Sequence, residues 1–393
     1  MQVQNLRLGV VSARKAFVDN GIWVDVGLGR LIDIWAATCR SVYMAISQER
    51  DLSPLHCHRL SIGSEFFFPM PFLPSLAGGL SRVRGCKQAI RQLEEHCDVV
   101  IVQLPFASPL ALLGARRPRV YHLCTDIKGN ASAYRGVRRL PALAVGGLVD
   151  TLQRRLLHRS DVRAVANGAQ LLEHYGFPPG RAMVSATLLE KEILSIPRQR
   201  AQGAPFRVLY VGYIRQEKGI DILLQAFEQL LEHIPQAELT IVGTPSTIDR
   251  GMSELVRRGI AKLAPRANVQ WIKYLDFGPE LFQCFADADV LALPSRSEGT
   301  PRVLIEARAF GCPVVGSNIG GIPSSIVDEV DGLLIPPENP AALKDAFLRI
   351  ANDRALRERL ITAGVERARA TTIEAFAAGI LDEALLLTKA ESA

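Results

Sequence analysis

Two glutamates, Glu298 and Glu306, and one lysine, Lys218, are the residues of this 393-residue chain whose types and spacing best suit chemistry. Glu298 precedes a Gly-Thr-Pro turn, and Glu306 stands eight positions later in a stretch with apolar residues at helical spacing. A carboxylate placed there can accept hydrogen bonds from vicinal hydroxyls, as acidic residues do for ribose. Free N–H groups at a helix start bind phosphates. The residues of this segment that we expect at a ligand are Glu298, Gly299, Thr300, Pro301, Arg302, Val303 and Glu306.

A parallel sheet has to position these groups. Residues 286–293 form a short apolar run that predicts a buried strand, and residues 302–310 predict the helix that follows. Residues 313–317 predict the next strand. Ligands of open α/β sheets lie outside the carboxyl ends of strands, so Glu298 is expected at the ligand-binding edge. A single glutamate would more simply be an exposed helix-end carboxylate, but the whole pattern favours a site.

Lys218 lies in a second loop of the same kind. The loop, residues 212–219, reads GYIRQEKG and joins a predicted strand at 207–211 to a predicted helix at 220–231. A lysine at a helix N-terminus after a glycine loop suits a diphosphate, because its charge adds to free N–H groups. Arg215 supplies a second positive charge in this loop.

The segment 294–322 reads, with variable positions as x, P-S-x-x-E-G-x-P-x-V-x-x-E-A-x-A-x-G-x-P-V-V-x-S-x-x-G-G-I. This pattern resembles the nucleotide-sugar motif of retaining glycosyltransferases of the GT4 type, which have the two-domain GT-B architecture. The resemblance implies that Glu298 holds hydroxyls of the donor sugar and that Glu306 holds the ribose. It implies that Arg215 and Lys218 hold the donor diphosphate, with Tyr213 at the usual arginine position. Further donor-binding positions implied by the resemblance are Gly212, Lys273 and Tyr274.

The N-terminal half resembles the family more loosely. Gly27, Gly29 and Arg30 match the glycine loop that opens the first helix and faces the acceptor and the donor phosphates. Glycines at this place can also serve only to permit a tight turn. Asp126 matches the family aspartate that follows a strand, and we include it among the catalytic candidates. Thr125 stands where relatives have a histidine, and His122 lies three residues earlier, within the predicted strand.

The expected fold is α/β, with two Rossmann-like, doubly wound domains facing across a cleft. Alternating strands and helices predict parallel sheets covered on both faces. We place the N-terminal domain at residues 1–195 and a polar, Pro- and Gly-marked linker at 196–205. The C-terminal, donor-binding domain follows at residues 206–371. A last helix at 372–393 is expected to cross back to the N-terminal domain.

Composition limits the class of protein. The chain is 48% hydrophobic and 22% charged, with a net charge of +6. That charge fits an anionic substrate or membrane surface, and is too small to indicate nucleic acid. Seven cysteines without a CxxC pair predict reduced thiols in a cytosol. We expect no metal site and no cofactor, because Arg215 and Lys218 can neutralise a diphosphate without a divalent cation.

Two segments suggest a lipid-linked acceptor. Residues 65–76 combine four Phe with three Pro, which predicts either core packing or an apolar lip beside the acceptor. Residues 135–163 carry seven Arg against two Asp among leucines, which predicts a helix on an anionic membrane or an ordinary solvated one. No apolar stretch is long enough to span a bilayer. We therefore expect a cytoplasmic protein at the inner face of the membrane.

The sequence thus predicts a retaining hexosyltransferase. It would move a sugar from a UDP- or GDP-sugar to a glycan or lipid-linked acceptor, in polysaccharide or glycolipid biosynthesis. A nucleotide-sugar epimerase or hydrolase would keep the fold. A non-catalytic scaffold that partners another transferase is the alternative from a different class, supported by Thr125 and Tyr213.

Overall fold

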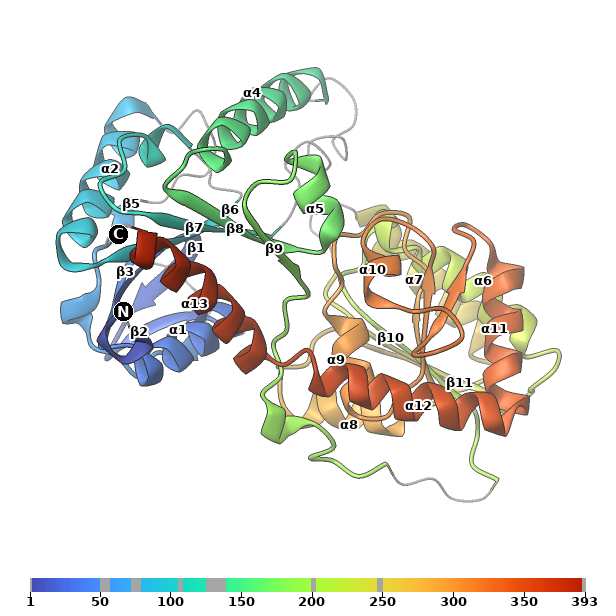
Figure 1. The fold of residues 1–393 in the computed structure, drawn as a ribbon. Coiled ribbons are helices and arrows are strands. Elements are labelled where there is room, and N and C mark those ends of the chain that lie inside the picture. Colours follow the sequence, from blue (N-terminus) through green and yellow to red (C-terminus); the bar gives the residue numbers. More distant parts are fainter. Residues whose placement is uncertain are drawn as a thin grey trace. The chain divides into compact units, whose positions relative to one another are not determined.

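The computed structural model describes residues 2–49, 57–71, 79–104, 109–124, 139–198, 203–245 and 250–390. The chain divides into two compact units, of which the first comprises Met1–Val184 and Ile373–Ala393 and the second Ser185–Thr372 (Figure 1). Residues 185–195, which the sequence analysis assigned to the N-terminal domain, therefore lie in the second unit. There the Leu194 N–H donates to the carbonyl of Ala309 (3.0 Å).

The first unit is built on one sheet, to which nine strands contribute within the described residues. Its parallel strands lie in the order β5-β3-β1-β6-β7-β8-β9, and β2 pairs antiparallel with β1 and with β4. The strands are β1 (Arg7–Val18), β2 (Ile22–Asp25), β3 (Ser41–Gln48), β4 (Cys57–Arg59), β5 (Met70–Pro71), β6 (Val99–Leu104), β7 (Arg119–Leu123), β8 (Val162–Asn167) and β9 (Gly180–Met183).

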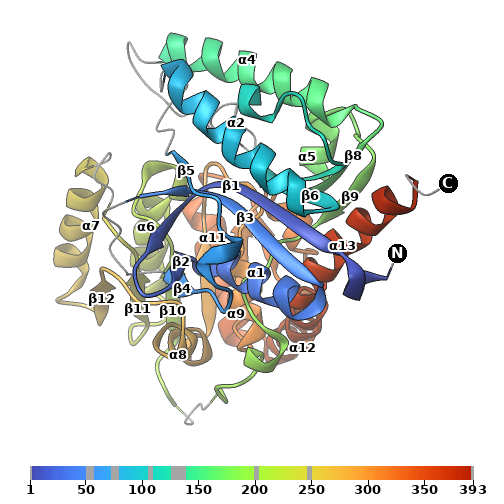
Figure 2. The ribbon, with the colours of Figure 1, turned by 90° about the vertical axis from the view of Figure 1, so that its left-hand side faces the viewer.

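Helices cover both faces of this sheet, which explains why β6 and β7 are buried along their whole length. The helices α1 and α13 pack together on one face, and α2 and α4 lie on the other (Figure 2). The α-helices are α1 (Val26–Thr38), α2 (Gly79–His96), α4 (Arg139–Leu157), α5 (Ala169–His174) and α13 (Ile373–Ala390), and the 3₁₀ turns are η1 (Val3–Asn5), η2 (Ser64–Phe66) and η3 (Pro109–Leu112).

The last helix, α13, is an integral part of the first unit. The buried indole of Trp35 in α1 donates a hydrogen bond to the Ala377 carbonyl (3.1 Å). Glu383 is 3% exposed and pairs with Arg163 of β8 and Arg181 of β9. The chain thus returns to its first sheet after completing the second unit.

The second unit holds a six-stranded parallel sheet within the described residues, in the order β12-β11-β10-β13-β14-β15. The order runs outward in both directions from the β10–β13 pair. The strands are β10 (Arg207–Val211), β11 (Glu238–Val242), β12 (Val269–Ile272), β13 (Val290–Leu293), β14 (Val314–Ser317) and β15 (Leu333–Ile335). The helices are α6 (Ile220–Leu230), α7 (Arg250–Leu263), α8 (Pro279–Asp287), α9 (Val303–Ala309), α10 (Ile322–Ser325), α11 (Pro340–Asn352) and α12 (Arg354–Arg369).

The strand expected over residues 286–293 was wrong at its start, because α8 continues to Asp287 and β13 begins at Val290. An apolar run cannot distinguish a buried helix end from a buried strand. Here the rings of Phe282 and Phe285 stack on the ring of Phe310, and their centroids lie 4.6 Å and 6.1 Å from its centroid. This packing keeps the segment helical.

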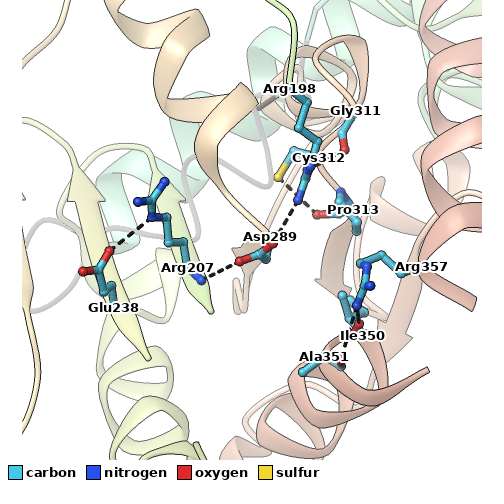
Figure 3. A network of polar contacts seen from close by, with 10 residues as sticks. All are labelled: Arg198, Arg207, Glu238, Asp289, Gly311, Cys312, Pro313, Ile350, Ala351 and Arg357. Atoms are coloured by element: carbon cyan, nitrogen blue, oxygen red, sulfur yellow. Dashed lines mark hydrogen bonds and ion pairs between the residues drawn. The ribbon is translucent and has the colours of Figure 1, made fainter. Parts of the chain in front are cut away.

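Polar contacts fasten the segment before β10 to the second unit (Figure 3). Arg198 donates to Asp289 (3.0 Å) and to the Gly311 carbonyl (2.8 Å). The Arg207 N–H donates to the other oxygen of Asp289 (2.8 Å), so one buried carboxylate joins this segment to β10. Arg207 also bonds Glu238 on the neighbouring strand.

Burial and hydropathy add two further facts. None of the seven cysteines, all within the described residues, forms a disulfide, and burial raises the pKa of Cys39 and Cys312 to about 12. Over the part of the chain that the structure describes, no helix is both long and apolar enough to cross a membrane.

Candidate active site

The two loops singled out from the sequence leave neighbouring strands at the point where the sheet order reverses. Residues 212–219 follow β10, and residues 294–302 follow β13, which is the hydrogen-bonded neighbour of β10. Connections diverge to opposite sides at such a switch point and leave a crevice at the carboxyl ends of the strands. The topology therefore brings the two loops together at the edge where α/β proteins bind ligands.

Lys218 and Glu298 meet at this edge. The Lys218 ammonium donates to Glu298 Oε1 at 2.6 Å, and the Ser295 hydroxyl donates to the same oxygen at 2.8 Å. The Glu298 side chain is only 8% exposed, so little water screens the pair. Two charges of opposite sign are thus held together at the carboxyl-end edge of the sheet.

Glycines allow the backbones of these loops to approach each other. Gly219 has φ +65°, and a Cβ on it would lie 1.9 Å from the Pro294 carbonyl oxygen. A Cβ on Gly320 would lie 2.2 Å from the Glu298 carbonyl oxygen, which also accepts a hydrogen bond from the Gly321 N–H (3.2 Å). The glycine pair that follows β14 therefore supports the loop that carries Glu298.

Arg215 lies against an aromatic ring. Its guanidinium carbon is 4.9 Å from the Tyr213 ring centroid, within the range of a cation–π interaction. The Tyr213 carbonyl accepts a hydrogen bond from the hydroxyl of Tyr210 (2.9 Å). Complete burial raises the pKa of Tyr210, so this hydroxyl stays protonated and keeps donating. Glu217 lies 3.7 Å from the guanidinium of Arg215.

The remaining candidates of the Glu298 loop lie at the start of α9. Pro301 is buried, Val303 is the first residue of the helix, and Glu306 is half-buried one turn inside it. The N-cap residue Arg302 has no side-chain acceptor for a capping hydrogen bond, and its guanidinium donates to the Thr187 hydroxyl (2.8 Å). A Cβ on Gly299 would meet no atom within 4 Å.

Three further candidates follow β10 and β12, the two strands on either side of β11. The Gly212 N–H donates to the Val242 carbonyl (3.0 Å), which ties the end of β10 to β11. Lys273 and Tyr274 directly follow β12, and the Tyr274 hydroxyl donates to Asp276 (2.5 Å). Lys273 is exposed.

The predicted glycine loop of the first unit was wrong, because Gly27, Gly29 and Arg30 lie in the first turns of α1. Gly29 is buried, and a Cβ on it would lie 2.5 Å from the ring of His58. Asp25 caps this helix by accepting from the Leu28 N–H (3.2 Å). Close packing against His58 therefore explains why position 29 is a glycine without any need for a ligand.

Of the other candidates in the first unit, the structure describes only His122. Asp126 and Thr125 lie outside the described residues. His122 is buried in β7, where its Nε2 lies 3.2 Å from Asn167 Oδ1 and its ring packs edge-on to Phe376 of α13. These contacts are those of a core histidine.

Known proteins resemble this chain in sequence. A sequence profile described as glycosyl transferases group 1 matches residues 194–367. The D-inositol 3-phosphate glycosyltransferase of Kribbella flavida is 30% identical over 304 residues, which cover 72% of this chain and 69% of that protein. The chain belongs to the glycosyl transferases group 1 family. Its resemblance to this family, predicted from the motif around Glu298, is confirmed.

Other group 1 relatives match a smaller part. The D-inositol 3-phosphate glycosyltransferase of Corynebacterium diphtheriae is 29% identical over 233 residues, 55% of this chain and 54% of that protein. The chain thus spans about half the length of this curated relative. The structure of HepE from Anabaena in complex with UDP superposes with a TM-score of 0.70 at 18% identity, covering 98% and 99% of the chains. That likeness is one of fold, and it confirms the predicted GT-B class with two Rossmann-like units.

The sequence analysis of this group 1 glycosyltransferase gave no role to Ser295, Tyr210 or Arg296, although all three form hydrogen bonds in or beside the two loops. Ser295 stands three positions before Glu298 in a turn, a spacing at which a hydroxyl can reach the carboxylate. The Tyr210 hydroxyl also reaches a partner three positions along the chain, the Tyr213 carbonyl. The partners of Arg296 lie on another loop and on α6, and no local pattern indicates them.

Proposed function

We propose that this group 1 glycosyltransferase transfers a hexose from a nucleotide sugar to an acceptor, with retention of configuration. The observation that carries the proposal is the meeting of Lys218 and Glu298 at the switch point of the second sheet. A diphosphate-linked sugar needs a cation for the phosphates and an acceptor group for the sugar hydroxyls at adjacent places. This pair provides both within one crevice.

Each candidate has a role in the proposed reaction. Lys218 and Arg215 stabilise the diphosphate as negative charge develops on it, an electrostatic effect that usually dominates catalysis. Glu298 accepts hydrogen bonds from sugar hydroxyls, and Glu306 accepts them from the ribose. The cations of the chain itself neutralise the leaving group, so we expect turnover without a divalent metal.

We infer front-face attack, in which the leaving phosphate takes the proton of the acceptor hydroxyl. Glu298 Oε1 already accepts hydrogen bonds from Lys218 and Ser295, which lowers its strength as a nucleophile. A covalent intermediate on Glu298 is therefore not needed. Closure of the site around the donor would exclude water and limit hydrolysis.

The donor is proposed to be a UDP- or GDP-sugar. The structure of HepE contains UDP, which supports UDP as the first nucleotide to test. The acceptor is proposed to be a glycan or lipid-linked carrier in polysaccharide or glycolipid synthesis. Relatives named for D-inositol 3-phosphate support a polyhydroxylated acceptor.

Exposed leucines support the proposal of peripheral contact with an anionic membrane at its cytoplasmic face. Leu148 of α4 is 61% exposed, and Leu110 and Leu113, in and beside η3, are also exposed. The turn η3 contacts both α4 and α2. Arg155 is exposed on α4, so a cation accompanies the apolar side chains, as on interfacial helices.

A thermal-shift panel tests the donor. UDP, GDP, ADP and their sugars are added with and without EDTA, since a ligand of the native state raises the melting temperature. We expect a rise with one nucleotide family, unaffected by EDTA and lost in Glu306→Ala. No rise with any of them would favour the scaffold alternative.

Turnover separates the enzyme from a scaffold. Lys218→Ala should abolish transfer while the protein stays folded, because a scaffold has no turnover to lose. Lys262→Ala is the matched control, since Lys262 pairs with Glu228 on the exposed surface of the same unit. Equal activity in the two variants would overturn the role of Lys218.

A further inference from the structure

Arg296 links the two loops of the candidate site. It lies between Ser295 and Glu298 in the loop after β13, but its side chain reaches α6 and the loop after β10. Its Nη1 donates to the Gln216 carbonyl (2.9 Å) and to Asp221 Oδ1 (2.8 Å), and its Nη2 donates to Asp221 Oδ2 (2.7 Å). Its backbone N–H donates to the Glu217 carbonyl (2.7 Å).

The pairing with Asp221 is the strong part of this link. A guanidinium and a carboxylate joined by two parallel, charge-assisted hydrogen bonds fix both distance and orientation. Both side chains are partly buried, and Asp221 stands in the first turn of α6, where the helix dipole favours negative charge. The third partner, Glu338, is 66% exposed and contributes little.

The hydrogen bonds of Arg296 hold the chain before and after Lys218. On the β10 side, Arg296 holds residues 216, 217 and 221, which stand on both sides of Lys218 in the chain. On the β13 side, Arg296 is two positions from Glu298. Movement of one loop relative to the other would have to break these hydrogen bonds, so they fix the separation of Lys218 and Glu298.

We propose that Arg296 is a positioning residue that holds the diphosphate-binding loop and the sugar-binding loop in register. This inference rests on the proposed function. A nucleotide sugar spans both loops, with its diphosphate at Lys218 and its sugar at Glu298. Free UDP has the diphosphate for Lys218 and the ribose for Glu306 in α9, but it has no donor sugar for Glu298. Loss of the link therefore affects the intact donor far more than it affects UDP, since misplacement by about 1 Å can cost about 100-fold in rate.

The test compares UDP affinity with donor turnover in Arg296→Met and Arg296→Lys. We expect UDP affinity, measured by titration calorimetry, to stay within about threefold of the wild type. We expect kcat/KM for the donor sugar to fall at least about tenfold in Arg296→Met, mainly in kcat. Arg296→Lys, which keeps the charge but not the paired geometry, should fall in between. Arg257→Met removes an exposed ion pair of the same unit and should change neither value.

Exchanging the charges of Arg296 and Asp221 tests whether the pairing itself is what positions the loops. The double variant Arg296→Asp/Asp221→Arg should recover part of the turnover that Arg296→Asp alone loses. UDP affinity and turnover that fall together, in step with the melting temperature, would overturn the proposal in favour of a purely structural role. Unchanged turnover in Arg296→Met would overturn it too. A wild type that binds no nucleotide would instead remove the proposed function, and this inference with it.

Discussion

The ammonium of Lys218 and the carboxylate of Glu298 lie 2.6 Å apart, although 80 positions separate them in the chain. The two groups proposed for opposite ends of the donor thus neutralise each other in the structure. A bound donor would replace this contact with two others. Its diphosphate would bind Lys218, and its sugar hydroxyls would bind Glu298. The pair holds both groups in place until then.

This pairing predicts the effects of Glu298→Gln on UDP binding and on turnover. Without the carboxylate, the Lys218 charge is fully available to a diphosphate, so UDP should bind a few fold more tightly. Turnover should fall about 10- to 100-fold, because a hydrogen bond to a charged group contributes about 1.5–3 kcal/mol. Calorimetry with UDP and steady-state rates measure the two effects. Glu338→Gln, at an exposed glutamate of the same unit, is the control, and weaker UDP binding in Glu298→Gln would contradict the prediction.

Gly219→Ala should disrupt the crevice. The new Cβ would meet the Pro294 carbonyl oxygen at 1.9 Å, and φ is +65°, so the substitution should cost more than about 1 kcal/mol of unfolding free energy. UDP binding should weaken as the Lys218 loop moves. Urea denaturation and calorimetry measure both. Gly147→Ala in α4 meets no atom within 4 Å and should stabilise by about 0.5–1 kcal/mol.

Glu383→Ala should destabilise the first unit strongly. The carboxylate is 3% exposed and accepts hydrogen bonds from Arg163 and Arg181, so its removal should cost about 1.5–3 kcal/mol, since the two arginines are partly exposed to water. The adjacent Asp382 is 60% exposed and pairs with Arg181 at 3.4 Å, so Asp382→Ala should cost no more than about 1 kcal/mol. Urea denaturation that shows equal losses for the two variants would contradict the docking of α13.

The Arg7–Asp98 pair should make the unfolding free energy of the first unit depend on pH in the acid range. Burial favours a higher pKa for Asp98, but hydrogen bonds and charge from Arg7 outweigh burial and hold that pKa below its usual value. A lowered carboxyl pKa stabilises the folded state above the unfolded pKa, which is about 3.9, and this contribution is lost as the pH falls through the folded value.

Asp98→Asn measures that contribution. The difference in unfolding free energy between wild type and variant should stay constant from pH 7 to about pH 5, and shrink below about pH 4. Urea denaturation across this range is the measurement. A difference that grows with acid would contradict the assignment.

The sequence by itself determined the local elements of this protein and the loops of its candidate site. Strand β10 lies at the predicted residues 207–211, because apolar runs and flanking turn residues are local signals. The same signals placed Lys218 before a helix and Glu298 after a strand, and the motif around Glu298 identified the family. Local signals failed where two structures suit one pattern, as in residues 286–289 and at the start of α1.

Only the tertiary structure decided which of these groups meet. The contact of Lys218 with Glu298 and the pairing of Arg296 with Asp221 exist because β13 is the neighbour of β10, a result of sheet order that no short window contains. Packing likewise explained Gly29 by the ring of His58. Spacing along the chain fixes which faces and loops residues occupy. Pairing across the fold depends on long-range packing, which brings together residues that no local pattern relates.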